Sequence, residues 1–410
     1  MTWRHQQFTD ASLKRHVLVV ASTFPSSPTD PVPAFVKELV VATRLADPAT
    51  RISVLAPHDP RSDTQDFTRH EYYDEYRFRY MWPRRWQVLA GQGGIGPSLR
   101  RNRFLYLVVP FFLFFEFFAV LRLNRMLRPD VINAHWIIPQ GVVCALANLF
   151  ARRKLVLTVH GGDVFTFNHP FAIWLKRWAM RRSARIVVNS TVTRDKARSI
   201  YPDGDYEVIP MGVDLAEFEG RQTTGDAPLR VLFVGRLSEE KGVIDLLDAL
   251  AILQERGIPF QARIAGTGPQ AAELVAMGDA TGLGDSAQFL GWVAHDQLAD
   301  HYHWADVFVG PSIASSTGWI EALGVVFIEA SASGLPIVTT DTGGMRDVVL
   351  DRETGFIVEE KSPEQIADRL AQLSEDRQLG LRLGAAGVRR VTTNFSWPSI
   401  ASRYAELFRA

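Results

Sequence analysis

The stretch VLFVGRLSEEKGVIDLLDALAILQERG, residues 231–257, contains the turn on which the fold depends. It opens with a short apolar run of the kind found in strands covered on both faces of a sheet. A polar loop with Arg236 and Lys241 follows, and then an apolar pattern at helical spacing that should end at Gly257. Because cations and helix N–H groups at the end of a strand suit a phosphate, the stretch predicts a strand–loop–helix unit with an anion site.

The loops of this region leave two alternatives open. Glu239 and Glu240 lie beside the two cations, so the first loop is also typical of a solvated surface turn. In AGTGP, residues 265–269, Gly266 and Gly268 follow a strand-like run and would let a ligand approach the backbone. The same two glycines are equally typical of a tight turn.

The strand–loop–helix pattern recurs along the chain. The strand-like runs of the first half are residues 16–22, 51–57, 130–136, 154–161, 184–190 and 206–212. After a polar stretch at 220–228, the runs of the second half are 230–236, 260–268, 287–293, 306–312, 336–341 and 355–360. Apolar runs that alternate with helical patterns indicate parallel sheets with helices on both faces. The 410 residues therefore predict two doubly wound α/β domains, which bind ligands at the carboxyl ends of their strands.

The composition narrows the class of protein. Lys and Arg total 45, as do Asp and Glu, so nucleic acid is not an expected partner. Cys144 is the only cysteine and lies in an apolar stretch, which predicts a buried thiol and no disulfide within the chain. The N-terminal residues lack the pattern of a signal peptide. These features favour a cytoplasmic protein.

Two carboxylates, Glu321 and Glu329, lie eight positions apart on either side of Gly324. On one unbroken helix they would point roughly 80° apart, and the glycine argues against such a helix. We therefore expect Glu321 in a loop and a helix beginning near Phe327, with Glu329 in its first turn. The free N–H groups just before Phe327 would then be presented to an anion. Two unrelated surface glutamates are the alternative.

Four motifs occur in a fixed order: GRLSEEKG at 235–242, AGTGP at 265–269, GWV at 291–293, and the glutamate pair with EASASGLPIV at 321–338. The set resembles the retaining glycosyltransferases of family 4, also called group 1, which have the GT-B fold. The resemblance covers nearly the whole chain and is strongest over residues 206–360. It implies two Rossmann-like domains facing a central cleft. Residues 1–210 would bind the acceptor, with a last helix at 395–410 packing back on them, and residues 211–394 would bind a nucleotide sugar.

The resemblance also implies a role for each motif. Arg236 and Lys241 would neutralise the leaving diphosphate, Glu329 would bind the donor ribose, and Glu321 would bind the transferred sugar, while GWV would flank the base. The residues expected at the donor, a UDP-sugar or GDP-sugar, are Gly235, Arg236, Lys241, Gly266, Gly268, Gly291, Val293, Glu321, Gly324, Val325, Val326 and Glu329. The expected catalytic residues are His160, Arg236, Lys241 and Glu321.

The first half carries the expected acceptor site. The motif TVHGGDV places His160 just after a strand and resembles the histidine loop beside the anomeric carbon in the family. His135, one strand earlier, and Asp163 are expected to contact the acceptor, although His135 is equally typical of a structural histidine. The loop after the first strand departs from the family, because Pro33 and Ala34 stand where many members have adjacent glycines. This departure weakens the expectation that its amides contact the diphosphate.

An arginine-rich segment and an apolar run have no counterpart in a plain nucleotide-binding domain. Residues 76–103 hold seven arginines and no acid, together with Trp82 and Trp86. The arginines are Arg77, Arg79, Arg84, Arg85, Arg100, Arg101 and Arg103. Residues 104–121 follow, with Glu116 as their only charge. This run is a core helix, an interfacial helix whose arginine flank binds anionic lipid, or a membrane span, which would separate strands of one sheet.

These expectations combine into one function. The resemblance implies that a sugar moves, with retention, from a nucleoside diphosphate to a glycan or lipid-linked acceptor in cell-envelope or exopolysaccharide synthesis. No Asp-x-Asp motif follows a strand, so we expect neither a metal nor another cofactor. The arginines suggest peripheral binding to the inner face of the cytoplasmic membrane. A non-catalytic sugar-nucleotide binder and a nucleotide-sugar epimerase of similar architecture remain alternatives.

Overall fold

The structure is a computed structural model that describes residues 13–26, 32, 34–61, 65–90, 94–218, 228–315 and 320–410. The chain forms two compact units: a first unit of residues 1–212 with 397–410, and a second unit of residues 213–396. The predicted divisions fall after residues 210 and 394. Pro33 and most of the expected linker, residues 220–227, lie outside the described residues.

The sheet of the first unit has eight strands in the order β3-β4-β2-β1-β5-β6-β7-β8. They are β1 (Arg15–Val20), β2 (Thr50–Pro57), β3 (Phe67–Arg69), β4 (Asp74–Phe78), β5 (Val131–His135), β6 (Lys154–Val159), β7 (Arg185–Val188) and β8 (Tyr206–Val208). All neighbours are parallel except β3 and β4. The six predicted strands are confirmed. Strands β3 and β4 were not predicted, because they are short and charged rather than apolar.

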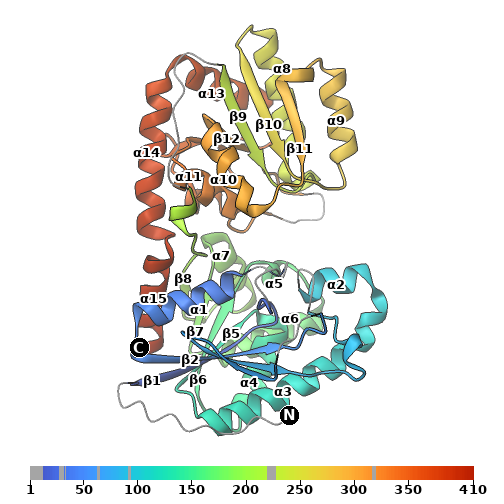
Figure 1. The fold of residues 1–410 in the computed structure, drawn as a ribbon, viewed down its shortest axis with the longest axis vertical. Helices are drawn as coiled ribbons and strands as arrows, with labels where there is room; N and C mark the ends of the chain where they lie inside the picture. The colour runs from blue at the N-terminus through green and yellow to red at the C-terminus, as the bar shows by residue number, and fades with distance from the viewer. Residues whose placement is uncertain are drawn as a thin grey trace. The chain divides into compact units, whose positions relative to one another are not determined.

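Helices cover both faces of this sheet (Figure 1). They are α1 (Phe35–Ala46), α2 (Ile95–Arg101), α3 (Val109–Leu127), α4 (Val142–Asn148), α5 (Gly162–Phe165), α6 (Pro170–Arg181), α7 (Thr191–Ile200) and α15 (Trp397–Arg409). The single turns are η1 (Arg84–Trp86), η2 (Arg103–Leu107) and η3 (Ile137–Gly141). Strand β1 shows the two-sided core, because Val17 and Val19 join the cluster of α1 and α15, whereas Leu18 and Val20 join that of α3 and α4. The sheet is therefore doubly wound, as predicted.

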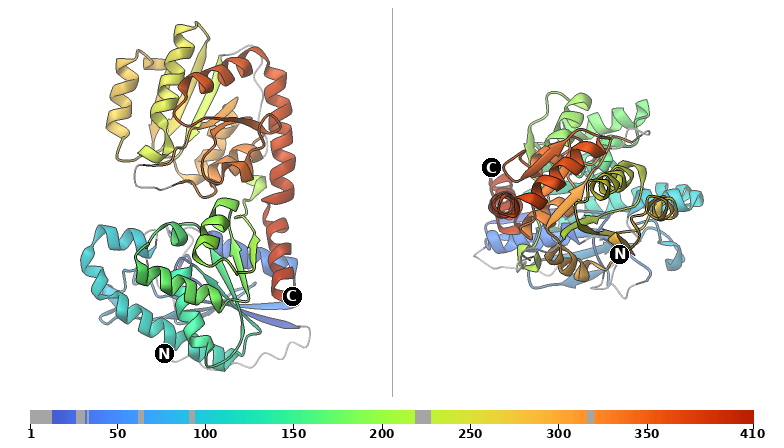
Figure 2. Two further views of the ribbon diagram at one scale, coloured as in Figure 1. Left: turned by 180° about the vertical axis from the view of Figure 1, so that it is seen from behind. Right: turned by 90° about the horizontal axis from the view of Figure 1, so that it is seen from above.

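The last helix, α15, belongs to the first unit. It lies alongside α1 (Figures 1 and 2). The Tyr404 hydroxyl lies 3.5 Å from Thr158 Oγ1, and Arg403 donates to the Val208 carbonyl at 2.6 Å. Lys154 in turn donates to the Leu407 carbonyl at 2.8 Å. These contacts fasten α15 to the strands β6 and β8.

The second unit is a six-stranded parallel sheet in the order β11-β10-β9-β12-β13-β14. Its strands, all predicted, are β9 (Leu229–Val234), β10 (Phe260–Ala265), β11 (Ala287–Gly291), β12 (Val307–Gly310), β13 (Ile337–Thr340) and β14 (Gly355–Val358). The helices are α8 (Val243–Glu255), α9 (Ala271–Ala280), α10 (His295–Trp304), α11 (Val325–Ala332), α12 (Met345–Val348), α13 (Pro363–Glu375) and α14 (Arg377–Asn394). Shorter turns are η4 (Leu215–Phe218), η5 (Glu239–Lys241) and η6 (Gly284–Ser286). Val307 and Val309 share a core cluster with α8, whereas Phe308 contacts rings from α10 and α11, so helices again cover both faces.

Helix α3 covers most of the apolar run and is amphipathic. Phe112, Glu116 and Val120 are buried, whereas Phe111, Phe114 and Phe118 are about half exposed. Burial raises the pKa of Glu116 to about 8, so this carboxyl is neutral at pH 7, and it accepts a hydrogen bond from Gln140 at 2.9 Å. Across the described residues no helix is long and apolar enough to cross a membrane, so the span alternative is wrong.

Two of the seven arginines do not belong to a basic surface. Arg77 is 2% exposed; it donates to Glu75 and to the carbonyl of Pro57. Arg79 donates to Asp66 at 2.9 Å. The expectation of seven arginines without a neutralising acid is wrong for these two, because β4 brings them beside acids that precede the segment. The other five are exposed: Arg84, Arg85, Arg100, Arg101 and Arg103.

Candidate active site

A pocket of about 440 Å³ lies at the carboxyl ends of β9 and β10 in the second unit. Its volume falls in the range of about 300–1,000 Å³ that ligand pockets occupy. Five predicted donor residues line it: Gly235, Arg236, Gly266, Gly268 and Val293. Trp292 lines it too and is 75% exposed, so its indole face is open to a planar ring. The prediction named Gly291 and Val293 but missed this tryptophan between them.

The two glycines after β10 form a tight turn and also line the pocket, so both alternatives given for them in the sequence hold. Gly266 has a φ of +144°, and a Cβ there would lie 1.8 Å from the Gly235 carbonyl oxygen. A Cβ on Gly268 would lie 2.1 Å from the carbonyl oxygen of Leu237. The glycines therefore let the loops after β9 and β10 pack closely together, and they line the pocket as well.

Lys241 and Glu321 form an ion pair. Lys241 ends η5, between β9 and α8, and Glu321 lies in the loop between β12 and α11, as predicted. The side chains keep only 17% and 12% exposure, so solvent screens the attraction less than at a surface. The structure thus brings the cation predicted for the diphosphate into direct contact with the carboxylate predicted for the sugar.

A glycine loop that the sequence analysis missed fixes the backbone of Glu321. The Gly344 N–H donates to the Glu321 carbonyl at 2.9 Å. Gly343 has a φ of +59°, and a Cβ there would lie 1.9 Å from the same oxygen. Its signal in the sequence is the glycine pair of DTGGMRD directly after β13, which is the same signal that AGTGP gives after β10.

Helix α11 begins at Val325, two residues before the predicted start, with Gly324 as a left-handed N-cap at a φ of 69°. Val325 and Val326 therefore present the N–H groups of the helix start, and Glu329 lies in the second turn, not the first as predicted. Glu329 is buried, and the Tyr302 hydroxyl donates to its Oε2 at 2.8 Å. Burial raises the pKa of Glu329. Tyr302, fully buried on α10, thus orients this carboxyl group.

In the first unit, His135 and His160 form a stacked pair at the ends of β5 and β6. The ring centroids are 5.2 Å apart, and His135 Nδ1 lies 3.0 Å from His160 Nε2. Burial lowers the pKa of His160 to about 3 and the pKa of His135 well below its usual range, so both rings are neutral at pH 7. His135 is completely buried, which contradicts its predicted contact with the acceptor and supports the structural alternative.

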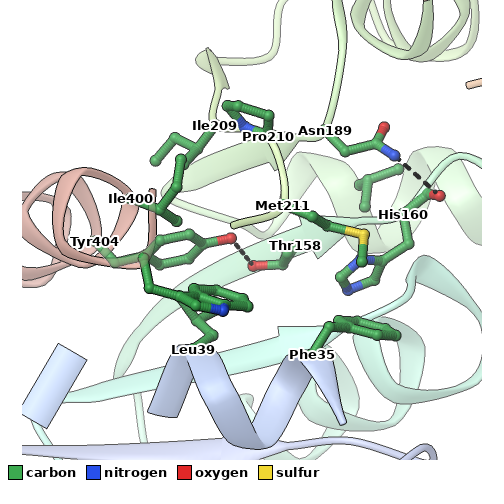
Figure 3. A pocket seen from close by; sticks show the side chains of 12 residues that line it. Phe35, Leu39, Thr158, His160, Asn189, Ile209, Pro210, Met211, Ile400 and Tyr404 are labelled. Atoms are coloured by element: carbon green, nitrogen blue, oxygen red, sulfur yellow. Dashed lines mark hydrogen bonds between the residues drawn. The ribbon is translucent and has the colours of Figure 1, made fainter. Parts of the chain in front are cut away.

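His160 also lines a cavity of about 20 Å³, shown in Figure 3. The ring of Phe35 lies 5.0 Å from the imidazole, and the side chain of Met211 points toward it. Nδ1 of His160 is buried, and no described residue forms a hydrogen bond with it. Because both ring nitrogens face the interior, this arrangement argues against proton transfer by His160.

Asp163 holds the loop of His160 in place. Its Oδ1 accepts the His160 N–H at 3.2 Å, and its Oδ2 accepts the Ile137 N–H at 2.9 Å. Burial raises the pKa of Asp163 to about 6. Asn189 donates to the His160 carbonyl at 3.3 Å (Figure 3), and the buried Lys176 donates to the backbone of α5. Neither Asn189, in the loop after β7, nor Lys176, on α6, was predicted, because neither belongs to a recognisable motif.

Family models match both units. A model of glycosyl transferases group 1 matches residues 217–390, and one of Glycosyltransferase Family 4 matches residues 39–217. The GDP-mannose-dependent alpha-(1-6)-phosphatidylinositol monomannoside mannosyltransferase of Mycobacterium tuberculosis is 30% identical over 303 residues. The match covers 70% of this chain and 78% of that protein.

Solved structures share the fold over nearly the full length. Sucrose-phosphate synthase from Thermosynechococcus elongatus has a TM-score of 0.71 at 21% identity, covering 97% of this chain and 98% of that one. The Anabaena protein HepE, in complex with UDP, has a TM-score of 0.70 at 20% identity, covering 97% and 100%. The two doubly wound units, the matched family models and the relative together make the chain an enzyme with the GT-B fold. It belongs to the group 1 glycosyltransferases of family 4.

Proposed function

We propose that this glycosyltransferase moves a sugar, with retention of configuration, from a nucleoside diphosphate sugar to a lipid-linked acceptor in cell-envelope assembly. The observation that carries the proposal is the ion pair of Lys241 and Glu321. In the donor, the diphosphate and the sugar are joined by a single bond. A cation that binds the diphosphate and a carboxylate that binds the sugar must therefore lie side by side, as Lys241 and Glu321 do.

The pocket beside Trp292 suits the nucleoside part of such a donor. A base would stack on the exposed indole, and Glu329, held by Tyr302, would accept hydrogen bonds from the ribose diol. The relative from Mycobacterium tuberculosis is named as GDP-mannose-dependent, and HepE was solved with UDP. Both bases therefore occur among similar proteins, and we propose a UDP-sugar or a GDP-sugar as the donor.

The proposed reaction depends on stabilising the leaving group. The bond between the anomeric carbon and the phosphate oxygen breaks while an acceptor oxygen bonds to the same face of that carbon. Negative charge grows on the leaving diphosphate, and Arg236 and Lys241 stabilise it more in the transition state than in the ground state. The acceptor's proton passes to the leaving phosphate oxygen. The neutral, inward-facing rings of His135 and His160 fit a reaction in which no histidine acts as the base.

A lipid-linked acceptor fits the surface of the first unit. The apolar surface of η2 and α3 consists of Phe104, Tyr106, Leu107, Phe111, Phe114 and Phe118, each 48% exposed or more. Five exposed arginines lie in the segment that runs from η1 to η2. Exposed aromatic side chains flanked by arginines are typical of protein surfaces that bind an anionic bilayer. The relative's name also specifies a phosphatidylinositol glycolipid as its substrate.

The release of nucleoside diphosphate tests the proposal. The protein is incubated with a panel of UDP-sugars and GDP-sugars, with and without a membrane lipid extract, and the free nucleotide and the anomeric configuration of the product are measured. We expect one donor to be consumed faster when lipid is present, with a product of the donor's configuration. An inverted product would contradict retention, and acceleration by soluble glycans instead of lipid would contradict the lipid-linked acceptor.

Chelation tests the expectation that the chain needs no metal. In the part of the chain that the structure describes, no three His, Cys, Asp or Glu side chains gather as a metal site would require. Because side-chain cations are proposed to hold the diphosphate, turnover should stay within about twofold of its original rate in excess EDTA. Loss of activity on chelation, with recovery after Mg²⁺ or Mn²⁺ is added, would contradict this prediction.

Sedimentation with vesicles tests the membrane surface. The wild type should pellet with anionic vesicles at low salt and remain in the supernatant with neutral ones, since each basic residue near an anionic bilayer contributes on the order of 1 kcal/mol. A variant with Arg84, Arg85, Arg100 and Arg101 changed to Glu should no longer pellet. The matched control changes the exposed Arg256, Arg352, Arg382 and Arg389 of the second unit to Glu. This control has the same net charge and should still pellet; equal loss in both variants would contradict a localised surface.

A further inference from the structure

The first unit contains a further pocket, lined in part by Asp163, one of the predicted acceptor residues. It has a volume of about 390 Å³ and lies between α2, α3 and the loops that follow β1, β5 and β6. We call it the α2–α3 pocket. Its volume is within the range of ligand pockets. All of its lining residues belong to the first unit.

The lining of the α2–α3 pocket changes from polar to apolar along its length. Thr23, in the loop after β1, and Asp163, on the short helix α5 after β6, line it near the edge of the sheet. Leu99 from α2 and Phe112 and Leu113 from α3 form apolar walls. Because unpaired polar groups are costly among such side chains, the apolar part suits a hydrocarbon, while the polar part suits hydroxyl groups. A free sugar would leave the apolar walls unused.

The pocket opens at a surface that is both apolar and basic. Tyr106 and Phe167 line it and are 56% and 51% exposed, so they form its rim. Arg100, exposed at the end of α2, lines it as well. Phe104 and Leu107 are the exposed neighbours of Tyr106 on η2, at 80% and 72%. A chain that leaves the pocket here would meet apolar side chains, and an anionic group beside it would meet an arginine.

We propose that the α2–α3 pocket binds the hydrocarbon chain of an anionic lipid acceptor, with the lipid's anionic group beside Arg100 and the hydroxyl groups of its head toward Asp163. This assignment rests on the proposed function, because it gives the lipid-linked acceptor of that reaction a defined binding site. The apolar surface of η2 and α3 then has a second role beside membrane attachment. It leads the chain of a single lipid from the bilayer to the pocket, so that the head reaches the carboxyl edge of the sheet.

Gly96 is a position on the pocket lining where a side chain can be added without a clash. This residue lies on α2, lines the pocket, and a Cβ there would meet no heavy atom within 4 Å. Gly96→Phe should therefore place a ring in the pocket while keeping the helix. Gly96→Ala is the matched control. It replaces the same glycine, but its methyl group leaves most of the pocket volume open. Val109→Phe, from the wall formed by α3, provides a second filling variant.

Isothermal calorimetry with lipids below their critical micelle concentrations gives the direct test. The probes are dioctanoyl phosphatidylinositol, farnesyl phosphate, and glycerophosphoinositol, which has the head but no chain. We expect at least one of the two chain-bearing probes to bind the wild type and Gly96→Ala at least tenfold more tightly than the chainless probe. Binding of the first assigns an acyl chain, and binding of the second assigns an isoprenoid chain. Both filling variants should lose this binding at least tenfold.

Two further readouts distinguish lipid binding in the pocket from membrane attachment and from donor turnover. The filling variants should still pellet with anionic vesicles, and they should still release nucleotide from the donor slowly in the absence of acceptor. The inference is overturned if neither chain-bearing probe binds the wild type, or if a folded Gly96→Phe binds like Gly96→Ala. If the wild type consumes no donor at all, the proposed function fails, while calorimetry still decides whether the pocket binds lipid.

Discussion

Replacing Lys241 with Ala should reduce the turnover number by about 100-fold or more, which corresponds to roughly 2.7 kcal/mol of lost transition-state stabilisation. The substitution removes a cation proposed for the leaving diphosphate and leaves Glu321 without its ion-pair partner. The fold should persist, because Lys241 lies in a partly exposed loop and not in the core. Steady-state kinetics with saturating donor measures the effect, and a thermal melt checks the fold. A rate within a few fold of the wild type would contradict the proposed role.

A double-mutant cycle separates the two roles that Lys241 could have. If the lysine only positions Glu321, then Lys241→Ala should cost nothing further in a Glu321→Gln background. If it stabilises the diphosphate, the loss should persist in that background at tenfold or more. We expect the second result, because the charge on the leaving group does not depend on the carboxylate of Glu321. Lys241→Arg, which keeps the charge, should recover part of the rate.

Glu329→Ala should lower kcat/KM for the donor by about 100-fold, again roughly 2.7 kcal/mol. The carboxyl group is buried and already accepts a hydrogen bond from Tyr302 at 2.8 Å, so its position is fixed before the donor binds. Loss of the carboxyl group removes the acceptor proposed for the ribose hydroxyls and leaves a buried tyrosine hydroxyl without this partner. Donor titrations that separate kcat from KM measure the effect, and an unchanged kcat/KM would contradict the assignment.

Tyr302→Phe is the matched control for this prediction. It keeps the aromatic contacts with Phe218 and Phe308 but removes the hydroxyl that orients Glu329. We expect a smaller loss, about tenfold in kcat/KM, because the carboxylate stays in place but is less well held. The melting temperature should fall only slightly in Tyr302→Phe. An equal loss in Tyr302→Phe and Glu329→Ala would contradict the expected difference and would show that the orientation set by the tyrosine hydroxyl matters as much as the carboxyl group itself.

The sequence predicted the strands of both sheets wherever burial on two faces produced a continuous apolar run. It did not predict β4, whose residues are DEYRF and are nevertheless buried. The charges of this strand are compensated by ion pairs: Asp74 pairs with Arg51 and Arg69 outside the strand, and Arg77 pairs with Glu75 within it. A pattern search cannot find such a strand, because the arginines that neutralise Asp74 lie outside it, 5 and 23 residues away in the chain.

In the candidate site, too, contacts between residues far apart in the chain could not be predicted from the sequence. The sequence located Lys241 and Glu321 at loops after strands, yet their contact joins residues 80 positions apart and became visible only in the fold. For His135 the sequence suggested a functional contact that the fold does not allow. Its position at a strand end is typical of a functional residue, but depth within the sheet decides its role, and burial depends on packing from several elements. Gly343 had a recognisable glycine signal, which was not assigned because no charged residue directly flanks the pair.

The position of α15 has a consequence for how the chain folds during synthesis. The first unit is interrupted after residue 212 and resumes at residue 397. At about 5–20 residues per second, a ribosome needs roughly 10–40 s to make the intervening segment. During that interval the apolar side of α1 and β1 lacks the residues Ile400, Tyr404 and Phe408 that later cover it. The first unit is therefore the first to begin folding and the last to complete it. Until α15 is made, the nascent chain exposes an apolar surface to which chaperones can bind.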